Sequence, residues 1–178
     1  MSPTRQPDRH AREAARVSQH GWQRSELVIW GAHGGAGTST LALWLQPAWD
    51  MGAMSPEPDP PYPATVSVGR ALIVACRSTA WAGQQATNAV AATIRQGGQV
   101  AVLAVVSDGW PEPATATSRF RLLQPQVGAV VQVPFIAALR VADDPAAVPL
   151  PRSARRALTA IRAAAGRTFP IPPTPQET

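Results

Sequence analysis

The chain has 178 residues, of which 45% are apolar and 15% charged, with 19 prolines and 13 glycines. This length and composition predict one folded domain with irregular connections and exclude two domains of ordinary size. It contains no lysine, so all 16 of its cationic side chains are arginine, and its net charge is +5. The arginines are spread along the chain without a nucleic-acid-binding motif, so we expect at most weak, non-specific contact with nucleic acid.

The cysteine content and the hydropathy of the chain indicate the cellular compartment in which we expect the protein. Cys76 is the one cysteine, which excludes an intramolecular disulfide and any paired-cysteine metal or redox site. The first residues carry no apolar stretch of signal-peptide length, and no run reaches the 18 or more apolar residues of a membrane span. We therefore expect a cytoplasmic protein with no membrane span.

The first third of the chain contains one strand, one glycine-rich loop and one helix. Residues 1–24 are basic and poor in large apolar groups, and we expect a flexible tail. Leu27–Trp30 predicts a short buried strand, and a helix from Thr38 should end at Gln46 because Pro47 cannot continue it. Asp50–Pro63 is then predicted to be irregular, with a proline-rich surface loop at residues 55–63.

The rest of the chain alternates between apolar runs and helical patterns. One predicted helix places Ala86, Val90 and Ile94 on one face, and the last is predicted to end at Gly166, before a disordered tail at residues 168–178. The predicted strands are Ala71–Cys76, Val100–Val106 and Ala129–Val133, and the predicted helices are Trp81–Gln96, Ala114–Gln124 and Arg152–Ala165, with a further helical turn at Phe135–Arg140.

This alternation predicts a three-layer α/β fold. Residues 25–167 should form a single P-loop-like domain with a mostly parallel sheet of four to five strands and helices on both faces. Ligands of such folds bind at the carboxyl ends of the strands. The loops after the first three strands, around Gly35, Arg77 and Asp108, therefore become the candidate site.

The loop after the first strand has the composition of a phosphate cradle. Gly34, Gly35 and Gly37 can adopt positive φ and leave no Cβ in the way, so that backbone N–H groups can face an anion at the start of a helix. The glycine spacing does not fit the dinucleotide-binding pattern. A tight strand-to-helix turn that binds nothing stays an alternative.

The run HGGAGTST, His33 to Thr40, resembles the deviant Walker A motif (KGGxGKTT or KGGxGKST) of the ParA/MinD family of partitioning and cell-division ATPases. Three glycines match, and Ser39 and Thr40 fall on the hydroxyl positions. His33 stands in place of the family's signature lysine, and Thr38 in place of its phosphate-binding lysine. The resemblance implies a nucleotide-binding P-loop of the residues His33, Gly34, Gly35, Ala36, Gly37, Thr38, Ser39 and Thr40, with Ser39 as the Mg²⁺ ligand.

The second half of the chain resembles this family more weakly. Asp108 falls near the position where the family contacts the nucleotide base, and Pro134 near its strand-end proline. The family's Walker B strand and its acids are not apparent after the first helix, which implies a truncated domain. Arg77, at a predicted strand end, is the best replacement for the missing phosphate-binding lysine.

These observations predict a protein that binds ATP or GTP, or another phosphate ligand, possessing little or no hydrolytic activity. The resemblance implies an accessory part in DNA partitioning or in plasmid or mobile-element maintenance, with a protein partner or a homodimer. One alternative is a non-enzymatic protein- or DNA-interaction module that kept the fold and lost the ligand. Another is an active ATPase that uses Arg77 or a residue supplied in trans.

Overall fold

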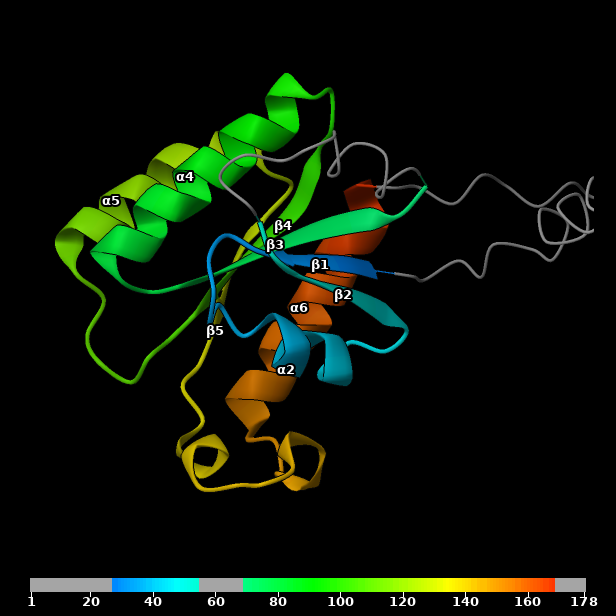
Figure 1. The fold of residues 1–178 in the computed structure, drawn as a ribbon, viewed down its shortest axis with the longest axis vertical. Helices are drawn as coiled ribbons and strands as arrows, with labels where there is room; N and C mark the ends of the chain where they lie inside the picture. The colour runs from blue at the N-terminus through cyan, green and yellow to red at the C-terminus, as the bar shows by residue number, and fades with distance from the viewer. Residues whose placement is uncertain (1–26, 55–68, 169–178) are drawn as a thin grey trace, which may run out of the picture.

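The computed structural model describes residues 27–54 and 69–168 (Figure 1). The predictions for residues 1–24, for the proline-rich segment 55–63 and for residues 169–178 lie outside this part of the chain. The described strands are β1 (Leu27–Gly31), β2 (Ala48–Ala53), β3 (Ala71–Arg77), β4 (Val100–Val106) and β5 (Val130–Val133). The helices are α2 (Thr38–Trp44), α4 (Ala80–Arg95), α5 (Ala114–Leu123) and α6 (Arg152–Thr168), with short 3₁₀ segments η1 (Gln124–Gln126), η2 (Ala137–Arg140) and η3 (Pro145–Ala147).

The five strands form one parallel sheet in the order β2-β1-β3-β4-β5, which confirms the predicted three-layer α/β architecture. Figure 1 shows α4 and α5 on one face of the sheet and α2 and α6 on the other. Alternate residues of β1 explain this arrangement, because Val28 packs with α4 and α5 whereas Ile29 packs with α2 and α6. The central strands are apolar on both sides, as expected for a covered parallel sheet.

The segment after α2 contains a strand that was not predicted. An irregular or extended loop was expected from Asp50, whereas β2 runs in parallel beside β1 from Ala48 to Ala53. The strand is at the edge of the sheet, and four of its six residues are exposed. Backbone pairing with β1, not burial of an apolar face, therefore defines β2, and hydropathy patterns cannot detect such a strand.

Two predictions for helices were also wrong. Gly166 does not end α6, which continues to Thr168, the first residue of the predicted tail. In α4, Ile94 is exposed and Thr93 is buried in its place. The Thr93 hydroxyl donates a hydrogen bond to the carbonyl oxygen of Ala89 at 2.9 Å, so the polar group is satisfied inside the core.

The strand order defines where a ligand is expected. The chain builds outward from β1 to β2 in one direction and from β1 through β3 to β5 in the other, so the switch point lies between β1 and β3. Doubly wound sheets of this order bind ligands outside the carboxyl ends of the strands at that point. The glycine loop after β1 and the end of β3 at Arg77 both lie there.

Candidate phosphate-binding pocket

The loop between β1 and α2 needs glycine at several positions. Gly35 and Gly37 have φ values of 75° and 90°, in the left-handed region that side chains disfavour. At Gly31, a Cβ atom would lie 3.0 Å from the carbonyl oxygen of His33 and 3.3 Å from that of Gly52. The glycines are therefore required by the backbone of this loop, whose left-handed conformations are of the kind that forms anion-binding nests.

His33 connects the glycine loop to the end of β3 through two hydrogen bonds. Its Nδ1–H donates to the carbonyl oxygen of Gly34 at 2.8 Å, and its Nε2 accepts the backbone N–H of Arg77 at 3.2 Å. The edge of its ring packs against Trp81, with 4.9 Å between the ring centroids. Because Nε2 accepts a hydrogen bond, it carries no proton, so the buried imidazole is neutral in this arrangement.

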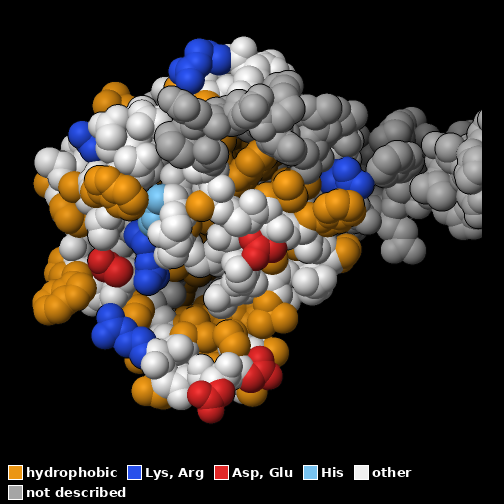
Figure 2. Space-filling model, in the orientation of Figure 1, with side chains coloured by type: hydrophobic (Ala, Val, Ile, Leu, Met, Phe, Trp, Pro, Cys, Tyr) orange, Lys and Arg blue, Asp and Glu red, His pale blue; other side chains and the backbone are white. Residues whose placement is uncertain are grey.

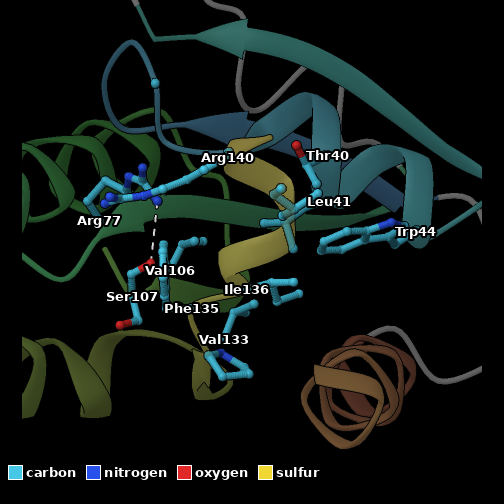
Figure 3. A pocket seen from close by; sticks show the side chains of 14 residues that line it. Thr40, Leu41, Trp44, Arg77, Val106, Ser107, Val133, Phe135, Ile136 and Arg140 are labelled. Carbon is cyan, nitrogen blue, oxygen red and sulfur yellow. Dashed lines mark hydrogen bonds between the residues drawn. The ribbon is translucent and has the colours of Figure 1, made fainter. Parts of the chain in front are cut away.

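A pocket of about 230 Å³ lies at the carboxyl ends of the strands, beside the glycine loop. Figure 3 shows Arg77 and Arg140 toward one end of it and Trp44 toward the other. Much of its surface is apolar, with contributions from α2, from the ends of β4 and β5, and from η2. Its lining residues are Gly35, Gly37, Thr40, Leu41, Trp44, Arg77, Val106, Ser107, Val133, Pro134, Phe135, Ile136, Leu139 and Arg140.

Among the described residues, the two arginines of the pocket contact neutral groups. Arg77 Nη1 donates to the carbonyl oxygen of Ser107 at 3.4 Å, drawn as the dashed line in Figure 3. Arg140 Nη2 donates to the carbonyl oxygen of Asp108 at 3.4 Å, and its guanidinium lies 4.9 Å from the centre of the Phe135 ring. Neither guanidinium pairs with a carboxylate of the described residues. Most of their N–H donors are thus free to bind an anion.

The structure divides the predicted site residues into two groups. Gly35, Gly37, Thr40 and Arg77 line the pocket. The others do not line it. Gly34 and Ser39 are exposed, whereas Ala36 and Thr38 are buried. His33 and Asp108 form hydrogen bonds within their loops. Thr40, and not the predicted magnesium ligand Ser39, is the hydroxyl residue in the first turn of α2 that lines the pocket.

The carboxylates near the ends of the strands accept hydrogen bonds from backbone N–H groups. Asp108 Oδ1 accepts the N–H of Trp110 at 3.0 Å, and Asp50 Oδ1 accepts the N–H of Gly52 at 2.9 Å. Within residues 27–54 and 69–168, no cluster of three or more histidine, cysteine or acidic side chains is arranged to hold a metal ion. The pocket therefore offers cations and N–H donors without an acidic counterpart, a combination that favours an anion with an apolar portion.

Arg140 and most of the apolar wall were not predicted. The expected site comprised the loops after three strands, although Val133 at the end of β5 and Phe135 just after it also line the pocket. A signal was available, since Arg140 closes the helical turn predicted at Phe135–Arg140, which appears as η2. Placing that turn opposite the glycine loop required the position of β5 in the sheet.

Comparison of the chain with protein-family models, curated proteins and solved structures finds no match. In the described part of the chain, none of the helices combines the length and apolar character required to cross a bilayer.

Cys76 lies in β3, and its side chain is on the opposite face of the strand from Arg77. Its burial predicts that the fold becomes less stable at alkaline pH. Burial, together with the negative charge of Glu112, raises the pKa of its thiol from 9.0 to about 12. The folded chain therefore keeps the thiol protonated, while the unfolded chain ionises it above its ordinary pKa. This contribution to stability is complete below the unfolded pKa and is lost as the pH rises toward the folded value.

Between about pH 8 and about pH 10.5, the free energy of unfolding should fall by about 2 kcal/mol more for the native sequence than for Cys76→Ala. Urea denaturation of both proteins at the two pH values measures the difference. Equal losses in both proteins would contradict the buried, protonated thiol.

Proposed function

We propose that this protein binds a phosphate-bearing small molecule, with ATP and GTP as the leading candidates, and does not hydrolyse it efficiently. The observation that carries the proposal is the pair Arg77 and Arg140, which face a glycine loop across one pocket without a carboxylate partner among the described residues. Guanidinium groups match the geometry of phosphate oxygens and bind them through charge-assisted hydrogen bonds. A phosphate on these groups would supply the missing counter-charge.

The arginines supply more positive potential to the pocket than the following helix does. Helix α2 has seven residues, and even a long helix contributes only about half an elementary charge at its N-terminus. Each guanidinium carries a full charge and remains protonated at any physiological pH. In the proposed site, Arg77 of β3 and Arg140 of η2 supply the positive charge that the resemblance assigns to a lysine at the position of Thr38.

The size of the pocket indicates how much of the ligand it encloses. Its volume of about 230 Å³ is below the range of about 300–1,000 Å³ usual for sites that enclose a drug-sized ligand. A phosphate group and a compact apolar or aromatic portion would fit beside Leu41 and Val133, whereas the remainder of a nucleoside triphosphate would extend outside.

Slow or absent hydrolysis follows from the missing catalytic parts. Phosphoryl transfer by P-loop proteins uses a lysine, an acid that holds Mg²⁺ and a group that positions the attacking water. The chain has no lysine, and Asp50 and Asp108 each accept a backbone N–H within their own turns. Mg²⁺ held by Ser39 stays a prediction, and we expect ligand binding that does not require the metal.

Titration calorimetry with ATP, GTP, AMP and inorganic phosphate, each with and without Mg²⁺, tests the proposal. We expect saturable binding of at least one of them that persists when EDTA removes the metal. Phosphate release measured on the same samples should not exceed the rate without protein. Absence of binding by all four compounds at millimolar concentration would overturn the proposed function, and steady phosphate release would favour the ATPase alternative.

A further inference from the structure

Two exposed tryptophans follow the carboxyl ends of β3 and β4, the edge of the sheet at which the pocket lies. Trp81, at the start of α4, has 60% of its surface exposed, and Trp110, in the loop after β4, has 76%. Large aromatic side chains usually bury most of their surface, so two that stay this exposed at one edge of a sheet need an explanation. Figure 2 shows arginine and apolar side chains close to one another beside a hollow on the viewed face.

Short chains of contacts connect the Trp81 side chain and the Trp110 backbone to the pocket arginines. The Trp81 ring packs on His33, whose Nε2 accepts the backbone N–H of Arg77. The backbone N–H of Trp110 donates to Asp108 Oδ1, and the carbonyl oxygen of Asp108 accepts from Arg140 Nη2. The Trp81 side chain and the Trp110 loop are thus each within two contacts of a pocket arginine. We call Trp81, Arg77, Arg140 and Trp110 the aromatic rim.

We propose that the aromatic rim binds single-stranded nucleic acid. Exposed indoles offer flat surfaces on which successive bases stack, and guanidiniums between them can contact the phosphates of the same strand. The net charge of +5 favours approach of a polyanion. The interaction extends beyond the small ligand proposed for the pocket, because it uses the outer faces of the two indoles, neither of which lines the pocket.

The chemistry of the rim favours a single strand over a duplex. In a duplex the faces of the bases are stacked on one another and cannot reach an indole. The rim contributes two cations, Arg77 and Arg140, and a third lies next to it, Arg119, whose Nη1 donates to the carbonyl oxygen of Ala80. Duplex binding normally draws on a larger set of phosphate contacts. The carboxylates nearest the rim are already hydrogen-bonded, Asp108 to the Trp110 N–H and Glu112 to the side chains of Thr117 and Gln132.

Fluorescence anisotropy with three labelled probes tests this proposal on the full chain. The probes are a 15-nucleotide oligothymidylate, an abasic oligomer of equal length, and a 15-base-pair duplex. Oligothymidylate should bind at least about 5-fold more tightly than the abasic oligomer, since each stacked base contributes about 1–3 kcal/mol. Its affinity should fall with salt with a logarithmic slope of about −1.4, or 0.7 for each of two phosphates.

Substitutions locate the interaction. Trp81→Ala and Trp110→Ala should each weaken oligothymidylate binding by about 5-fold or more, and Trp81→Phe should keep part of the affinity because a ring remains. Trp49→Ala is the matched control: Trp49 is 49% exposed and also lies beside an arginine, Arg70, but it belongs to β2 at the edge of the sheet. This variant should bind like the native chain.

The outcomes separate this proposal from the proposed function. Trp110→Ala should lose oligonucleotide affinity while its calorimetric titration with ATP or phosphate is unchanged, since Trp110 does not line the pocket. Equal binding of the abasic oligomer or of the duplex would overturn the stacking proposal. Lack of any oligothymidylate binding would also overturn it and would leave a protein partner as the occupant of the rim.

Discussion

Replacing both Arg77 and Arg140 by glutamine should reduce phosphate-ligand affinity by at least about 100-fold. A hydrogen bond to a charged group contributes about 1.5–3 kcal/mol, so two lost charge contacts exceed 3 kcal/mol, and 1.4 kcal/mol corresponds to a factor of ten. Glutamine keeps the polar character of the side chain and removes its charge, while Arg77 and Arg140 contact the carbonyl oxygens of Ser107 and Asp108 in the native chain. Calorimetric titration with the ligand that binds the native chain measures the loss.

The control for this pair is Arg155→Gln on α6. Arg155 is exposed and belongs to a separate group of arginines with Arg152 and Arg156, away from the glycine loop. The Arg155→Gln variant should bind the ligand as tightly as the native chain. A loss of affinity in this variant would indicate general charge attraction in place of a defined site. If the double variant binds as tightly as the native chain, the pocket arginines do not hold the phosphate.

The second large effect is expected at Gly128, which precedes β5. A Cβ atom there would lie 2.5 Å from the carbonyl oxygen of Ala101 and 2.7 Å from the Thr168 hydroxyl. The backbone cannot easily withdraw, because the Gly128 N–H donates to the carbonyl oxygen of Val100 at 2.9 Å. Overpacking of this kind costs about 3 kcal/mol, so Gly128→Ala should lower the melting temperature by about 6–12 °C.

Gly34→Ala provides the matched control for the Gly128 prediction. An added Cβ at Gly34 meets no atom within 4 Å, and its φ lies outside the left-handed region, so the change in unfolding free energy should stay within about 0.5 kcal/mol. Thermal unfolding followed by circular dichroism compares the two variants. Equal melting temperatures for Gly128→Ala and the native chain would contradict the close approach of β5 to β4.

Strong local signals made most of the fold predictable. The apolar runs at Ala71–Cys76 and Val100–Val106 correspond to β3 and β4, and the prolines and glycines mark several helix ends, such as Gly97 after α4. β2 was missed because an exposed edge strand is defined by pairing with β1, and hydropathy contains no information about pairing. The extension of α6 through Gly166 was missed because tertiary packing can override a weak helix former.

The parts of the site that could be predicted from the sequence are those marked by a local pattern of residues. The glycine loop and Arg77 were identified from the motif and from the rule that ligands bind at strand ends. Arg140 lies 103 residues after Gly37 in the chain, and only the position of β5 brings η2 against the loop. The part of His33 as a neutral bridge to the backbone of Arg77 likewise depends on a contact between the ends of β1 and β3.

The most direct test of the phosphate-binding pocket is a crystal structure of the protein grown with the calorimetrically identified ligand in EDTA. We expect its phosphate between Arg77, Arg140 and the backbone of Gly35, within hydrogen-bond distance of both guanidiniums, with its organic portion toward Leu41 and Val133. A ligand bound elsewhere, or a phosphate that contacts neither arginine, would contradict the account.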